Sequence, residues 1–116
     1  MEQALNRFGR IDCLVNEAGV FIGKPFTDYT FDDYFLVTSV NLAGFFNLTQ
    51  RVIGQMITQR GGHVVNVTTS LVDNADSKRP VALPALTKGG LAAVTRSLAI
   101  EYASRRIRVN AVALWG

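Results

Sequence analysis

The chain has 116 residues, of which 48% are hydrophobic and 18% are charged. This length suits one domain over residues 1–116, and the apolar content excludes a chain that is disordered by composition. No apolar run is long enough for a membrane-spanning helix, and the first residues lack the basic and apolar regions of a secretory signal. A net charge of +3 is too small to indicate a protein that binds nucleic acid.

Cysteine and histidine each occur once, as Cys13 and His63. A single cysteine excludes an internal disulfide and is typical of a reducing compartment, so we expect a cytoplasmic protein. Two such residues cannot supply the ligands of a usual zinc site, and we predict no metal.

The first half of the chain predicts a strand followed by a long helix. Residues 11–15 are short and almost continuously apolar, as in a parallel strand that is buried on both faces. Thr30 and Asp33 have the spacing of a capping box, which predicts a helix from Phe31 to about Gln59, ending at a pair of glycines. This helix is apolar on more than one face, so we expect it to be covered on more than one side.

The second half repeats the pattern. Residues 63–68 predict a strand, residues 69–83 a polar loop, residues 84–104 a helix and residues 107–114 a third strand. Strands that alternate with long helical crossovers predict a parallel sheet with right-handed connections. The sequence therefore predicts an α/β fold. With its neighbouring strands absent, the strand at residues 11–15 should be an exposed apolar edge, so we predict that the isolated chain is poorly soluble or oligomeric.

Several motifs in register resemble the short-chain dehydrogenase/reductase family. The matching stretches are residues 15–19 (Val-Asn-Glu-Ala-Gly), 40–44 (Val-Asn-Leu-Ala-Gly), 62–69 (Gly-His-Val-Val-Asn-Val-Thr-Thr), 87–90 (Thr-Lys-Gly-Gly), 98–103 (Leu-Ala-Ile-Glu-Tyr-Ala) and 107–112 (Ile-Arg-Val-Asn-Ala-Val). Each motif alone is weak, but their common order and spacing cover nearly the whole chain.

The resemblance implies part of a Rossmann-type, doubly wound, three-layer αβα domain. The chain would hold the fourth, fifth and sixth strands of a seven-stranded sheet. The glycine-rich turn that cradles the cofactor's pyrophosphate is expected upstream, and the loop that shapes the substrate pocket is expected downstream. Members are about twice this length, so we interpret the chain as the central part of one.

The resemblance also implies a chemistry and its residues. The family moves a hydride between NAD or NADP and a small carbonyl or alcohol substrate. Four residues fall at its catalytic positions: Asn41, Thr69, Ser70 as the neighbouring hydroxyl, and Lys88. Three residues fall at the motif close to the cofactor, which Lys88 also contacts: Asn16, Ala18 and Gly19.

The residue four before Lys88 is Pro84, where the family has its proton-donating tyrosine. Proline has no proton to give, although it is well tolerated in the first turn of a helix. Loss of a general acid typically lowers a rate by roughly 10²–10⁴. Two smaller departures are Glu17, in place of a second asparagine, and Trp115, where the family usually has Pro-Gly.

Three functions compete at this point. The first is a short-chain oxidoreductase in a full-length context, with this chain alone inactive. The second is a catalytically silent relative that binds a nucleotide or packs against a subunit, with the two long helices forming a homo-oligomer. The third treats residues 86–110 as a DNA-binding helix-turn-helix, which the strand-like end of that segment disfavours.

Overall fold

The computed structural model describes residues 2–7, 10–17, 19–69 and 80–114. Four strands form one sheet in the order β1-β2-β3-β4. The strands are β1 (Glu2–Arg7), β2 (Arg10–Glu17), β3 (Gly62–Thr69) and β4 (Ile107–Leu114). The pairs β2–β3 and β3–β4 are parallel, which confirms the predicted α/β fold of Rossmann type.

Strand β1 was not predicted. It pairs antiparallel with β2, from Glu2 opposite Asn16 to Arg7 opposite Arg10. The expectation that β2 would be an unpaired edge is therefore wrong. The physical reason is that the backbone donors and acceptors of an edge strand favour any segment that can pair with them, and only two residues separate β1 from β2.

The long helix predicted from Phe31 is interrupted. It consists of α1 (Phe31–Thr38), a π-helical stretch η2 (Ser39–Ala43) and α2 (Gly44–Gln59). Its start is confirmed in detail, because the Thr30 side chain accepts from the Asp33 N–H and the Asp33 carboxylate accepts from the Thr30 N–H. A short 3₁₀ turn, η1 (Phe26–Asp28), precedes it.

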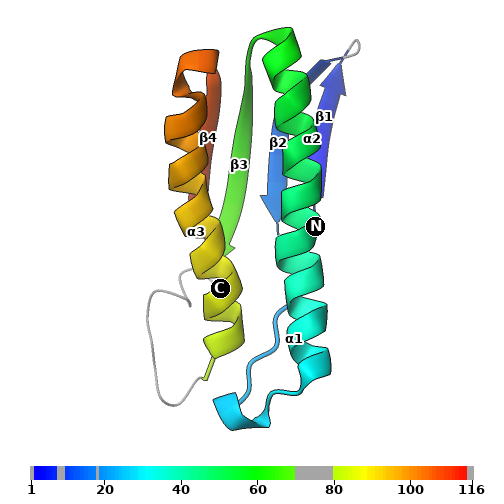
Figure 1. Cartoon of the computed structure of the whole chain (residues 1–116), viewed down its shortest axis with the longest axis vertical. Coiled ribbons are helices and arrows are strands. Elements are labelled where there is room, and N and C mark those ends of the chain that lie inside the picture. Colours follow the sequence, from blue (N-terminus) through cyan, green and yellow to red (C-terminus); the bar gives the residue numbers. More distant parts are fainter. Residues whose placement is uncertain (1, 8–9, 18, 70–79, 115–116) are drawn as a thin grey trace.

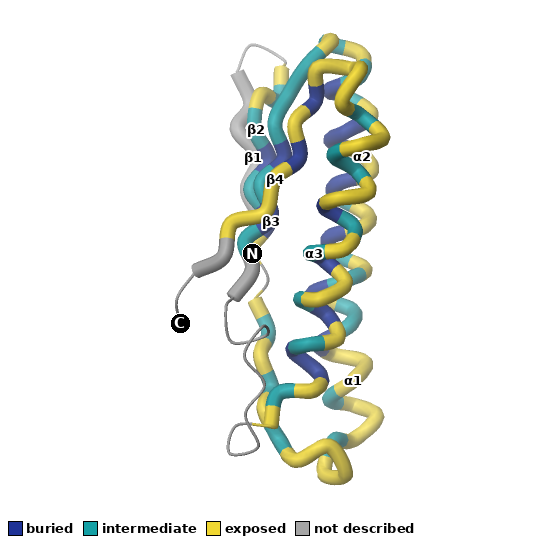
Figure 2. The backbone as a smooth tube through the Cα atoms, turned by 90° about the vertical axis from the view of Figure 1, so that its left-hand side faces the viewer, coloured by how far each residue is buried: buried dark blue, intermediate teal, exposed yellow. Residues whose placement is uncertain are grey.

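The second helix, α3 (Ala82–Tyr102), begins two residues earlier than predicted and continues into the 3₁₀ turn η4 (Ala103–Arg105). Figure 1 shows α2 and α3 side by side along the sheet, and Figure 2 shows the described helices on the same side of it. Among the described residues, no helix combines the length and apolar character needed to cross a bilayer.

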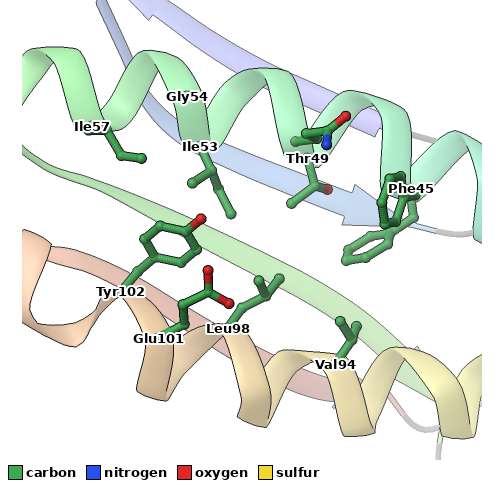
Figure 3. Close-up of a pocket in the computed structure, with 11 residues that line it drawn as sticks. Phe45, Thr49, Ile53, Gly54, Ile57, Val94, Leu98, Glu101 and Tyr102 are labelled. Atoms are coloured by element: carbon green, nitrogen blue, oxygen red, sulfur yellow. The ribbon is translucent and has the colours of Figure 1, made fainter.

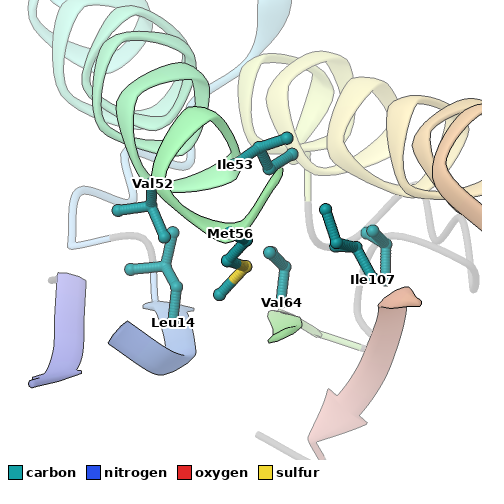
Figure 4. Packing of buried hydrophobic residues seen from close by; sticks show 7 residues of the cluster. Leu14, Val52, Ile53, Met56, Val64 and Ile107 are labelled. Atoms are coloured by element: carbon teal, nitrogen blue, oxygen red, sulfur yellow. The ribbon is translucent and has the colours of Figure 1, made fainter. Parts of the chain in front are cut away.

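The apolar core lies between the sheet and the two long helices (Figure 4). It consists of Leu14, Val52, Ile53, Met56, Val64, Ile107 and Val109, each at most 4% exposed. Met56 lies so close to β3 that a Cβ on Gly62 would approach its Sδ to 2.4 Å. Any side chain at Gly62 would therefore require the Met56 side chain to move.

Candidate functional site

The candidate site lies where the parallel strands end. Strand β2 ends with Asn16 and Glu17, and Gly19 follows as an exposed residue. Ala18, which the family resemblance placed at the cofactor, lies outside the described residues. The carboxyl ends of parallel strands are where open α/β sheets bind their ligands.

Asn41 lies in η2, and it is only 2% exposed. Its Oδ1 accepts from the Val20 N–H at 3.4 Å, and its Nδ2 donates to the Val20 carbonyl at 2.8 Å. The side chain thus pairs with both backbone groups of one residue and holds the segment that leaves β2. A π-helical turn inside a longer helix is often found at a functional site, and here it contains the predicted asparagine.

Lys88 lies on α3 and is partly buried. Burial lowers the pKa of its ammonium below the ordinary value, and the negative charge of Glu17 opposes this by raising it. The two residues are 71 positions apart in sequence, yet their charges interact across the end of β2. The structure thus brings Lys88 and the Asn16–Glu17 motif to one end of the sheet.

Pro84 lies in the first turn of α3 and is fully buried. The missing N–H costs nothing there, because the first N–H groups of a helix have no partner within it. The Pro84 carbonyl accepts a hydrogen bond from Thr87 Oγ1 at 3.1 Å. Pro84 is therefore a structural part of the helix start, and it has no ionisable group.

A phenol hydroxyl reaches this helix start from another element. Tyr29 Oη donates to the Ile22 carbonyl at 2.7 Å and accepts from the Leu83 N–H at 3.4 Å. No local signal in the sequence predicts this contact, because Tyr29 and Leu83 are 54 residues apart. Tyr29 joins the segment after β2 to the first turn of α3.

Thr69 is the last residue of β3, so its backbone ends at the expected edge of the sheet. Its side chain and all of Ser70 lie outside the described residues. A hydroxyl donor at this position stays a prediction.

A chain of buried amides and hydroxyls crosses the interior beside the site. Thr95 Oγ1 donates to the Leu91 carbonyl at 2.6 Å, so it must accept from Asn66 Nδ2 at 2.7 Å. The Asn66 Oδ1 then accepts from Asn16 Nδ2 at 2.9 Å. This order fixes the orientation of both amides.

Asn16 Nδ2 also donates to Thr49 Oγ1 at 3.0 Å, which brings α2 into the same chain of hydrogen bonds. The Asn16 Oδ1 has no hydrogen-bond partner, and the residue is 5% exposed. The side chain of Asn16 is thus directed into the interior and ties β2 to β3 and α2.

A metal centre has no support in the described part of the chain, where His, Cys, Asp and Glu side chains form no group of three or more.

Strands β2, β3 and β4 are parallel, and a partly buried lysine and a buried asparagine lie near their carboxyl ends, which is where Rossmann-type folds bind dinucleotides. The family model described as enoyl-(acyl carrier protein) reductase, which covers short-chain dehydrogenases, matches residues 1–114. The chain therefore belongs to the short-chain dehydrogenase/reductase family, whose members use NAD or NADP.

Individual relatives agree with this assignment. The chain is 39% identical to 3-oxoacyl-(acyl-carrier-protein) reductase of Thermotoga maritima, over 97% of this chain and 45% of that protein. Gluconate 5-dehydrogenase of Burkholderia cenocepacia, solved with NADP and tartrate, aligns with a TM-score of 0.86 at 32% identity, over 94% of this chain and 42% of that one. NAD⁺-bound xylitol dehydrogenase aligns with a TM-score of 0.84 at 35% identity, over 93% and 41%. The chain thus spans less than half the length of these relatives.

Proposed function

We propose that these residues form the central part of a longer NAD(P)-dependent oxidoreductase of the short-chain type. The reaction is hydride transfer between the nicotinamide and a small carbonyl or alcohol substrate. The observation that carries this proposal is the convergence at the carboxyl end of β2. There Asn41 holds the segment after the strand, and Lys88 interacts with the charge of Glu17.

The residues of this end fit a nicotinamide cofactor. When bound, the cofactor supplies or accepts the hydride. Lys88 is the cation that would hold a ribose hydroxyl, and its partial burial strengthens such a charged hydrogen bond. Gly19, two residues after Glu17, is exposed and has no side chain to block a ligand. Ala18 belongs to the same motif, and we propose the same proximity for it.

Two further groups support the chemistry in this proposal. Thr69 or Ser70 supplies the hydroxyl that polarises the carbonyl oxygen, since β3 ends at Thr69. Asn41 and Asn16 position the backbone around the site. Asn41 is hydrogen-bonded to Val20, and Asn16 is hydrogen-bonded to Thr49 and Asn66.

The chain alone lacks a proton donor at the family's tyrosine position, because Pro84 is buried there and has no acidic hydrogen. This supports the second candidate function, a relative that binds the nucleotide without transferring hydride. In both functions Lys88 holds the cofactor. They differ only in whether a carbonyl oxygen receives a proton.

The deciding experiment titrates NADH and NADPH into the complete protein, followed by turnover with carbonyl substrates. Saturable binding with turnover supports the oxidoreductase. Saturable binding without turnover supports the silent relative. If neither nucleotide binds, both proposals fail.

We also propose that α2 and α3 pack against a second copy of the chain. Between them lies a groove of about 340 Å³, whose lining is largely apolar (Figure 3). Phe46 beside it is 62% exposed. A symmetric dimer would cover such a surface. Phe46→Glu should then convert a dimer to a monomer in sedimentation experiments, and a wild-type monomer would refute the proposal.

The free thiol of Cys13 is consistent with a reducing compartment, and we propose a cytoplasmic location.

A further inference from the structure

Three arginines meet at the end of the molecule opposite the candidate site, where β3 and β4 begin (top of Figure 1). They line a hollow of about 310 Å³ together with Ile57 and the hydroxyl-bearing Ser104. The arginines are Arg60, Arg105 and Arg106, and we call this hollow the arginine corner. The Gly62 N–H donates to the Arg106 carbonyl at 3.2 Å, which joins the two turns that carry them.

Two of these arginines occupy backbone positions that favour glycine. Arg60 follows α2 with φ of 68°, and Arg106 follows η4 with φ of 59°. Both angles are left-handed, a conformation that costs energy for any residue with a Cβ. They are the two non-glycine residues with positive φ in the described chain, and both line the same hollow. Both arginine side chains thus line the hollow from backbone positions that favour glycine.

The helix dipole attracts a cation to the C-terminus of each helix. This attraction does not require the cation to lie at a left-handed backbone position. Within the part of the chain that the structure describes, none of the three arginines forms an ion pair with a carboxylate. The ion pairs of the described residues are Arg10–Asp12 and Lys24–Asp33, and neither involves the corner. The carboxylate of Glu101, in the last turn of α3, is hydrogen-bonded to Tyr102.

We propose that the arginine corner is an anion site that binds a ligand through a phosphate group. Planar guanidinium groups match phosphate oxygens in pairs, and three of them beside a serine hydroxyl supply donors on several sides. The concave hollow suits a small phosphate ester or pyrophosphate. This site is separate from the nicotinamide site, and the proposal does not depend on hydride transfer.

The test measures binding of inorganic pyrophosphate to the complete protein by calorimetry, with the nicotinamide cofactor site saturated and the ionic strength held constant with potassium chloride. We expect saturable binding of one pyrophosphate per chain. The double variant Arg60→Asn with Arg106→Asn should weaken it at least tenfold. Asparagine tolerates the left-handed conformation, so both turns are retained.

Arg96→Asn is the matched control, because Arg96 is an exposed arginine of α3 outside the corner. It should change the affinity less than twofold. If the double variant loses its circular dichroism spectrum, Arg105→Gln replaces it and should weaken binding at least threefold. Absence of saturable binding, equal weakening by Arg96→Asn, or unchanged affinity in the corner variants would overturn the proposal.

Discussion

The interior beneath the sheet changes character within two residues along the strands. Leu14, Val64 and Val109 are register partners and belong to the apolar core. One step further, on the same face, Asn16 pairs with Asn66, and both are buried amides. The first row stabilises the domain by burial, and the second holds the strand ends beside the candidate site.

The two rows should respond differently to substitution. Hydrophobic contacts are non-directional, so the apolar row tolerates small shifts of its side chains. A hydrogen-bonded row fixes position, because each donor must meet one acceptor. We therefore expect substitutions in the apolar row to lower the free energy of unfolding, and substitutions near the polar row to alter binding and turnover.

Pro84→Tyr in the complete protein is the largest expected effect. It restores a proton donor four residues before Lys88, on the same helix face, and should raise turnover of a carbonyl substrate by roughly 10²–10⁴. Pro84→Phe is the matched control, since it adds the ring without the hydroxyl and should leave turnover unchanged. Equal turnover by the two variants would show that the missing acid does not limit turnover in the wild type.

Leu14→Ala tests the apolar row. Leu14 is 0% exposed, and truncation of such a residue typically costs about 2–5 kcal/mol of the free energy of unfolding. Urea titration measures this loss. Val112→Ala on β4, where the side chain is 45% exposed, should stay within about 0.5 kcal/mol of wild type. Folded Leu14→Ala protein should still bind the cofactor normally. Weakened binding would contradict the expectation that the apolar row affects stability and not cofactor binding.

Lys88→Met tests the candidate site, where we expect a change in cofactor affinity rather than in stability. The loss of a charged hydrogen bond costs roughly 1.5–3 kcal/mol, which is about 10–100-fold in cofactor affinity. Fluorescence titration with NADPH or NADH measures the change. Arg96→Met removes the same charge from an exposed position of the same helix and should have little effect. Unchanged affinity in Lys88→Met would remove this residue from the cofactor site.

Local signals predicted the three parallel strands and the two long helical segments, but neither β1 nor the π-helical stretch η2. The spacing of Thr30 and Asp33 located the start of α1, because a capping box involves neighbours in sequence. The parallel strands β2, β3 and β4 followed from their short apolar runs and long crossovers. These features depend on residues close together in the chain, so periodicity and capping rules suffice for them.

The rest of the site depends on contacts between distant residues. Asn16 and Asn66 are 50 residues apart, and the sequence does not show which amide partners they have. The π-helical turn around Asn41 was missed for the same reason, since its side chain bonds to Val20, 21 residues away. Motif spacing predicts which residues belong to the site, and their roles stay predictions, but it did not predict that Asn16 would be directed into the interior.

Thr30→Ala tests the start of α1 and should have a smaller effect. Loss of a Thr N-cap usually costs about 1 kcal/mol of the free energy of unfolding, because it removes the hydroxyl acceptor, here that of the Asp33 N–H. Urea unfolding measures the cost. The comparison is Thr58→Ala, whose hydroxyl donates within α2 to the Gly54 carbonyl and caps no helix. A loss of equal size in the two variants would contradict the capping argument.

The smallest expected effect is a pH dependence at the amino end of β3. Burial lowers the pKa of His63, and the positive charge of Arg108 lowers it further. The folded pKa therefore lies below the unfolded value of about 6.5, so the unfolded chain binds more protons between the two. Stability should rise with pH across that window and fall when the solution is acidified through it.

His63→Gln isolates this contribution, because glutamine does not titrate and its amide still offers a partner to Asn110, which lies 2.9 Å from His63 Nε2. The free energy of unfolding of wild type minus that of the variant should increase from about pH 5 to about pH 7.5. Arg108→Gln should make this increase smaller, since one of the two causes is removed. An unchanged difference across the range would mean that His63 has the same proton affinity in the folded and unfolded states.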